Sequence, residues 1–164
     1  MEIYLLRHGI AVERDEHRGP DEERALTEEG RRKTRQAAKA MHVMRLSFDV
    51  IFSSPLVRAL QTAEIVADTP RLKRRLQLTE HLAPQATSQK QIAWLKNLRP
   101  APTTALLVGH EPNLSALISR LLTGDEDIAI HFKKGGLCKV TVERPGSGCA
   151  TLEWLLTPKQ MELM

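Results

Sequence analysis

Short apolar runs alternate with helical patterns along most of this 164-residue chain. Residues 2–6, 49–52 and 103–108 are runs of strand-forming residues of the kind found in buried strands. A helical pattern follows each of them, starting near Thr27, near Pro55 and at Leu114. Such alternation favours parallel strands joined through helices, which cover both faces of the sheet.

The last third of the chain has a different pattern. Gly135-Gly136 and the turn sequence at 145–148 separate strand-like segments at 128–132, 137–142 and 150–156. We therefore predict a single-domain α/β fold: a mixed, mostly parallel sheet with helices on both faces and a C-terminal β-hairpin. Thr27, Ser53 or Ser54, and Ser88 are the expected helix caps.

Size and composition indicate one domain over residues 1–164, with 41% hydrophobic and 27% charged residues. No apolar run is long enough to cross a bilayer and no signal peptide is recognisable, so we expect a cytoplasmic protein that does not bind membranes. Cys138 and Cys149 are expected to be buried free thiols. A net charge of +4 suits an anionic ligand, whereas 4% aromatic residues argue against nucleic-acid binding.

Charged and imidazole side chains recur where predicted strands end. Arg7 and His8 follow the first strand, Arg58 lies in the helical turn after the second, and His110 follows the third buried strand. Ligands of open α/β sheets bind at the carboxyl ends of the strands. Two arginines brought together there would predict a bound phosphate or sulfate, because a shared anion offsets their repulsion.

The chain resembles the histidine phosphatase superfamily, whose fold is phosphoglycerate mutase-like. The resemblance is carried, in the family's order, by Leu6-Arg7-His8-Gly9 at the end of the first strand and by three further segments, at 53–63, 78–82 and 108–112. The short length, the Leu-Thr-Glu-Glu-Gly helix start at 26–30 and the C-terminal hairpin are most similar to the small SixA-like branch, which acts on phosphohistidine.

The resemblance implies that His8 is the nucleophile and that Arg7, Arg58 and His110 join it in binding phosphate. It implies no metal and no cofactor. Glu80 matches a region where larger relatives place a proton donor, although a Glu paired with a nearby basic residue is an equal alternative. The other four histidines, at positions 17, 42, 81 and 131, are expected to be exposed or locally bonded.

The function implied is hydrolysis of phosphohistidine on a signalling protein, through a covalent intermediate on His8 and with phosphate ion as product. The alternatives are a phosphatase for small phosphomonoesters and a non-catalytic phosphoprotein-binding module. We expect a monomer. The loop from Ile10 to Arg24 and the basic run from Arg71 to Arg75 could form the rim of the site or could be ordinary surface.

Overall fold

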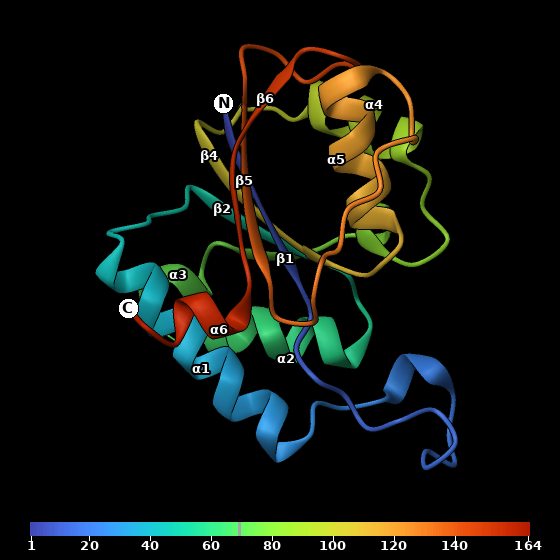
Figure 1. The fold of residues 1–164 in the computed structure, drawn as a ribbon, viewed down its shortest axis with the longest axis vertical. Helices are drawn as coiled ribbons and strands as arrows, with labels where there is room; N and C mark the ends of the chain where they lie inside the picture. The colour runs from blue at the N-terminus through green and yellow to red at the C-terminus, as the bar shows by residue number, and fades with distance from the viewer. Residues whose placement is uncertain (69) are drawn as a thin grey trace.

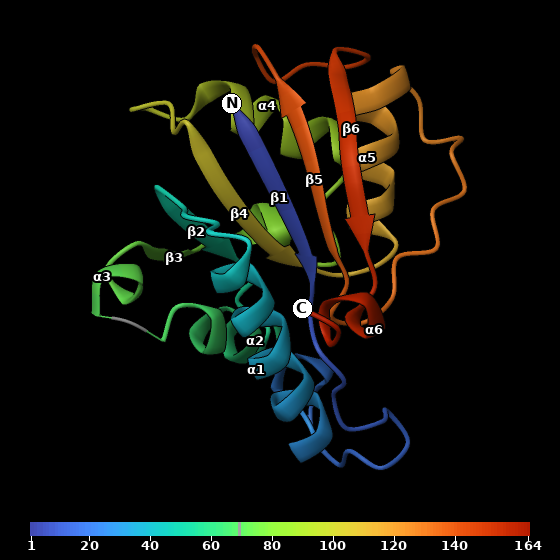
Figure 2. The ribbon, with the colours of Figure 1, turned by 60° about the vertical axis from the view of Figure 1, so that its left-hand side comes forward.

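The computed structural model describes residues 1–68 and 70–164. Within them, six strands form one sheet (Figure 1), and Figure 2 shows their order, β3-β2-β4-β1-β5-β6. The first four strands in that order are parallel to one another, β5 is antiparallel to β1, and β6 is antiparallel to β5. The strands are β1 (Glu2–Arg7), β2 (Val50–Ser53), β3 (Leu76–Leu78), β4 (Thr104–Gly109), β5 (Leu137–Val142) and β6 (Ala150–Leu156). The predicted mixed sheet and C-terminal hairpin are confirmed.

Helices cover both faces of the sheet, as predicted (Figure 2). One face packs against α1 (Glu28–Val43), α2 (Val57–Val66) and α6 (Pro158–Met161). The other packs against α4 (Ser88–Asn97) and α5 (Asn113–Thr123). The remaining elements are α3 (Pro70–Lys73) and two 3-10 turns, η1 (Asp21–Glu23) and η2 (Glu80–Leu82).

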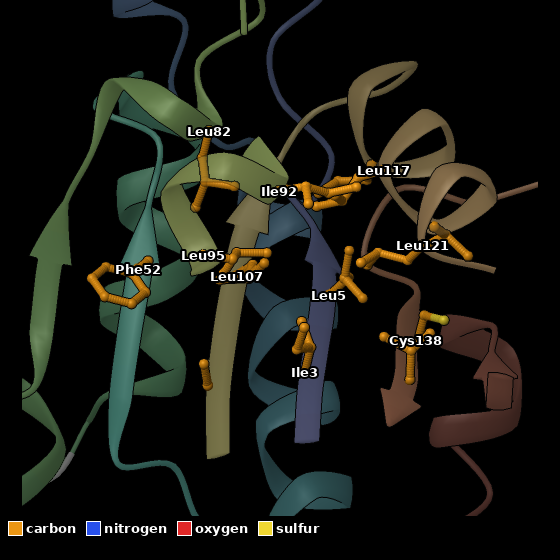
Figure 3. Packing of buried hydrophobic residues seen from close by; sticks show 14 of the residues in the cluster. Ile3, Leu5, Phe52, Leu82, Ile92, Leu95, Leu107, Leu117, Leu121 and Cys138 are labelled. Carbon is orange, nitrogen blue, oxygen red and sulfur yellow. The ribbon is translucent and has the colours of Figure 1, made fainter. Parts of the chain in front are cut away.

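Burial on both faces explains the uninterrupted apolar runs. In β1, Ile3 and Leu5 face α4 and α5, whereas Tyr4 and Leu6 face α1 and α2. Figure 3 shows the first of these two layers, with β-strand side chains meeting Leu95 of α4 and Leu117 of α5. Successive strand residues point to opposite faces of the sheet. A strand that is covered on both faces is therefore apolar at every position. This core fixes the strand ends at which the site lies.

One predicted strand is wrong. Residues 128–132 form no strand, although Phe132 is buried. Side chains bind backbone groups of this segment, because Arg7 Nη1 donates to the carbonyl of Phe132 and Ser119 Oγ accepts from the amide of Ile128. Backbone groups satisfied in this way do not need a ladder partner.

Two predicted helix caps are also wrong. Helix α2 begins at Val57, and its N-cap residue is Leu56, which provides no side-chain cap, instead of Ser53 or Ser54. Helix α4 is capped by Thr87 instead of Ser88. Ser54 is instead bonded to His110, and Ser88 to Arg120 and Glu126. Thr27 does cap α1, with its hydroxyl accepting from the amide of Gly30. Polar side chains near a helix start can thus bind other side chains instead of capping the helix.

Both cysteines are free, as predicted, but only Cys138 is buried and Cys149 is exposed. The basic run 71–75 spans the end of α3 and the approach to β3, and the Arg71 side chain lies outside what the structure describes. No helix in the described part of the chain is long and apolar enough to cross a membrane.

A close approach of two backbones brings the start of α1 beneath the end of β1. A Cβ atom added at Gly30 would lie 2.0 Å from the carbonyl oxygen of Ile10, which only glycine avoids. The amide of Thr27 also donates to that carbonyl, at 2.9 Å. The chain leaving His8 is therefore held against α1 before it enters the loop from Ile10 to Arg24.

Candidate active site

The parallel pairing of β1 and β4 brings the two predicted histidines together. Arg7 is in register with Gly109, and the amide of His8 donates to the Gly109 carbonyl at 3.1 Å. The next residue on each strand is a histidine, and the centroids of the rings of His8 and His110 are 5.1 Å apart. Both are almost fully buried, at 7% and 2% exposure. Two histidines about a hundred residues apart in sequence thus lie together at the carboxyl end of the sheet.

Hydrogen bonding fixes the tautomer of His8. Its Nδ1 lies 2.7 Å from the carbonyl oxygen of Gly9, which can only accept a hydrogen bond. We therefore assign the ring proton to Nδ1, and the lone pair to Nε2. The Gly9 amide is held in turn by Thr62 Oγ1 of α2, at 3.1 Å. The Nε2 lone pair of His8 is therefore available for reaction.

His110 has the complementary arrangement. Its Nε2 lies 2.8 Å from the hydroxyl oxygen of Ser54, which also accepts from the amide of Leu56 at 3.3 Å. Because the Ser54 hydroxyl has no other acceptor for its proton among the described residues, we take it to donate to Nε2 and assign the ring proton of His110 to Nδ1. That Nδ1 is buried and has no hydrogen-bond partner among the described residues. One imidazole thus offers a lone pair and the other an N–H donor.

Both rings are neutral at physiological pH. Burial lowers the pKa of His8 to about 3, helped by the nearby His110, Arg58 and Arg7. Burial also lowers the pKa of His110 to about 3, again helped by Arg58. A further positive charge beside the arginines would be costly at so buried a position. The environment that gathers cations therefore keeps the His8 lone pair free.

The two predicted arginines are anchored in the same way. Arg7 Nη1 donates to the Phe132 carbonyl and Arg58 Nη1 donates to the Asp21 carbonyl, each at 2.7 Å. In both side chains Nε is buried and has no hydrogen-bond partner among the residues that the structure describes. A buried donor without a partner costs about 1–3 kcal/mol. These two Nε atoms and His110 Nδ1 are donors suited to the oxygens of a phosphoryl group.

The surrounding backbone is fixed by a glycine turn. Gly135, with a φ of 76°, donates its amide to the carbonyls of both Arg7 and His8, at 3.0 and 3.1 Å. Across residues 1–68 and 70–164, no group of three or more His, Cys, Asp or Glu side chains could hold a metal ion. The arrangement is suited to bind an anion next to a neutral imidazole.

Glu80 lies in a turn beside the site. It begins η2, and the carbonyl of Leu82 in this turn lies 3.5 Å from a Cβ built on Gly109, so η2 adjoins the site end of β4. Its side chain is exposed and makes no hydrogen bond or ion pair with the described residues. Neither the burial expected of a proton donor nor the alternative ion pair is present there.

The other histidines lie at or near the surface, as predicted. His42, His81 and His131 are exposed, and His17 lies 3.0 Å from the Pro20 carbonyl through its Nε2. The loop from Ile10 to Arg24, which holds His17, does reach the site, because Asp21 binds Arg58.

Three contributors to the site were not predicted from the sequence. Asp21, Ser54 and Thr62 bind Arg58, His110 and the Gly9 amide respectively. Ser54 and Thr62 lie inside the 53–63 motif, which could have drawn attention to them. Nothing in the charged loop distinguishes Asp21 from its acidic neighbours.

Comparison with known proteins gives consistent results. The family profile described as histidine phosphatase superfamily (branch 1) matches residues 3–83. A protein of Picosynechococcus sp., itself uncharacterized, is 37% identical over 138 residues, covering 84% of this chain and 82% of that protein. Phosphohistidine phosphatase SixA of Escherichia coli is 25% identical over 164 residues, covering 99% and 98% of the two chains.

Solved structures match over nearly the whole length. The structure of protein histidine phosphatase SixA complexed with tungstate has a TM-score of 0.85 and 25% identity, covering 97% of this chain and 98% of that one. The alpha-ribazole phosphatase of Shigella flexneri has a TM-score of 0.74 at 20% identity, covering 96% and 97%. At that identity the second likeness concerns the fold alone.

Proposed function

Because this chain belongs to the histidine phosphatase superfamily and is a phosphatase, we propose that it removes phosphate from phosphorylated histidine on a protein, by way of a phosphohistidine intermediate on His8. The observation that carries this proposal is the pairing of a neutral, tautomer-fixed His8 with buried donors on Arg7, Arg58 and His110 that have no partner among the described residues. Such an arrangement would provide both a nucleophile and a binding site for the group it attacks.

In the first step, His8 Nε2 attacks phosphorus. The Nε2–P bond forms as the bond from phosphorus to the leaving group breaks, and the leaving group departs with that electron pair. Arg7, Arg58 and the His110 Nδ1 proton bind the three non-bridging oxygens of the transferred phosphoryl group, where charge gathers in the transition state. His8 becomes cationic while it carries the phosphoryl group, and its Nδ1–H keeps the bond to Gly9.

The leaving group must accept a proton. On a phosphohistidine substrate the departing imidazole nitrogen can be protonated beforehand, so the demand on the protein is small. For an alkyl phosphate the leaving oxygen needs a donor, and we assign Glu80 as the candidate for that step. Its exposed position supports a smaller contribution than a buried acid would make.

In the second step, water attacks the phosphoryl group. An oxygen–phosphorus bond forms, the Nε2–P bond breaks, and the electron pair returns to His8. The proton lost by water leaves with phosphate or passes to solvent. The low pKa of His8 makes it a good leaving group here, because the free ring is stable without a second proton.

A protein substrate is supported over a small one by the greater likeness to SixA, whose name states phosphohistidine as its substrate. The SixA structure has a TM-score of 0.85 at 25% identity, against 0.74 at 20% for the alpha-ribazole phosphatase. Small phosphomonoesters remain the second candidate, because the fold is shared with the alpha-ribazole phosphatase.

The test compares phosphate release from a histidine-phosphorylated carrier protein, from sugar phosphates and from an aryl phosphate. We expect the carrier protein to give the highest kcat/KM. After brief mixing with labelled carrier, acid-labile, base-stable label should appear on wild-type enzyme and be absent from His8→Ala. Faster hydrolysis of sugar phosphates would favour the second candidate, and phosphate binding without any turnover would favour a binding module.

A further inference from the structure

The loop from Ile10 to Arg24 places a carboxylate directly on a phosphate-binding arginine. Asp21, in η1, accepts from Arg58 Nη1 through its backbone carbonyl at 2.7 Å and from Nη2 through Oδ2 at 2.9 Å. Its other carboxylate oxygen, Oδ1, accepts from Arg24 Nε at 2.8 Å. Arg58 is therefore bound from the loop side at both of its terminal nitrogens.

The shape of a guanidinium group decides what remains available. Its five N–H bonds lie in one plane and form two forks, one at the end between Nη1 and Nη2 and one at the side between Nε and Nη2. Asp21 binds the two nitrogens of the end fork. The side fork keeps the buried Nε of Arg58, which has no partner among the described residues. The side fork is therefore the one that Asp21 leaves open to an oxyanion.

Asp21 is itself well anchored for a loop residue. Arg24 donates through Nη1 to the Val12 carbonyl at 2.7 Å while its Nε binds Asp21, so the two ends of the loop are joined. Partial burial opposes ionisation of Asp21, but Arg24 and Arg58 outweigh that effect and hold its pKa below the ordinary value. Arg14 lies 3.5 Å away but is 81% exposed and adds little.

We propose that Asp21 is a positioning residue that holds the Arg58 guanidinium with its Nε side toward the transferred phosphoryl group. This inference rests on the function proposed above. It gives the loop a role in the reaction although Asp21 itself touches neither substrate nor His8. Because Asp21 carries a negative charge near the bound anion, it also weakens phosphate binding and so favours release of the product.

The proposal predicts a split between turnover and binding. In Asp21→Ala, Arg58 loses the carboxylate contact and kcat for an aryl phosphate should fall about 30-fold, less than the roughly 10²–10³-fold that removing a transition-state donor outright costs. Inorganic phosphate should bind as tightly as to wild type or up to several-fold more tightly, because a repelling charge is gone. Asp21→Asn keeps an oxygen acceptor for Nη2 and should recover most of kcat. Glu23→Gln is the matched control, since it removes the same charge from the same turn, whereas the carboxylate on Arg58 is that of Asp21.

Three measurements decide the outcome. Steady-state kinetics give kcat, and calorimetry with inorganic phosphate gives the phosphate affinity. The 15N–1H signal of Arg58 Nε reports the orientation of the guanidinium without turnover. Phosphate should shift that signal in wild type, Asp21→Asn and Glu23→Gln, but not in Asp21→Ala. Unchanged kcat in Asp21→Ala, or equal losses of kcat and phosphate affinity, would overturn the proposal. If wild type does not hydrolyse phosphate esters, the proposed function fails, and the Nε signal still decides the role of Asp21.

Discussion

The strand ends and the loop contribute to one site by different means. His8 and His110 follow paired strands whose side chains are packed on both faces, and their rings are held by backbone and hydroxyl groups. Asp21 comes from a charged loop with little regular structure, and it is held mainly by Arg24 and Arg58. The two histidines are thus fixed by the core, whereas the orientation of Arg58 depends on ion pairs at the rim.

Replacing the nucleophile should have the largest effect. His8→Ala removes the attacking nitrogen from the strand end, and we expect kcat to fall by about 10⁴-fold or more, as for other covalent catalysts. Phosphate binding should survive, since Arg7, Arg58 and His110 remain. Initial rates with aryl phosphate measure the loss, and His42→Ala, on the exposed surface, serves as the control. Residual activity above about one hundredth of wild type would contradict the role of His8.

The two arginines test the comparison directly. Arg7→Lys and Arg58→Lys keep the charge but lose the planar fork, so each should lower kcat by about 10²-fold. Arg58→Lys also loses the two contacts to Asp21, so it should raise the mobility of the loop, measured by amide hydrogen exchange at residues 12–24. Arg18→Lys, in the same loop but exposed, should behave as wild type. Equal exchange in all three variants would show that the loop does not depend on Arg58.

The junction between strand end and loop should be sensitive to a single methyl group. Gly30→Ala places a Cβ against the Ile10 carbonyl, and forcing the two backbones apart should cost about 3 kcal/mol of unfolding free energy. Urea unfolding followed by circular dichroism measures the loss. Arg32→Ala, an exposed change in the same helix, provides the comparison. A loss below about 1 kcal/mol for Gly30→Ala would mean that the helix can move away without penalty.

Acid should weaken the fold through the strand-end histidines. An unfolded histidine binds a proton near pH 6.5, whereas His8 and His110 do so near pH 3. Between these values the unfolded chain holds more protons, so stability falls as the pH falls, by roughly 1.4 kcal/mol per pH unit for each ring. Urea titrations at several pH values from neutral down to about 4 measure the slope. His8→Asn should remove one proton's share of it, and an unchanged slope would contradict the neutral buried ring.

Glu80 should give the smallest effect. Because its carboxylate is exposed, Glu80→Gln should change aryl phosphate hydrolysis by less than about threefold, below the roughly 10²-fold that a positioned general acid contributes. Alkyl phosphates, whose leaving groups need a proton most, are the sensitive substrates. A loss of more than about tenfold on alkyl phosphate alone would establish Glu80 as the proton donor.

The sequence by itself determined the layered α/β fold and pointed to four site residues. Buried strands need apolar runs, and residues that interrupt such runs at the strand ends, like Arg7, His8 and His110, are therefore visible in the sequence. Arg58 was found in the same way, in the turn after the second run. The strand predicted at 128–132 is absent because only Phe132 of its apolar residues is buried, and Ile128 is exposed. An apolar run in the sequence does not show whether its residues pair as a strand.

Only the tertiary structure decided the tautomers, the hydrogen-bond partners and the pKa values of these side chains. The tautomers of His8 and His110 depend on Gly9 and Ser54, and the free side of Arg58 depends on Asp21, 37 residues away in sequence. Hydrogen-bond partners and low pKa values come from distances and burial, which composition and spacing do not encode. For that reason the sequence could name the candidate site residues but not the loop carboxylate that binds Arg58.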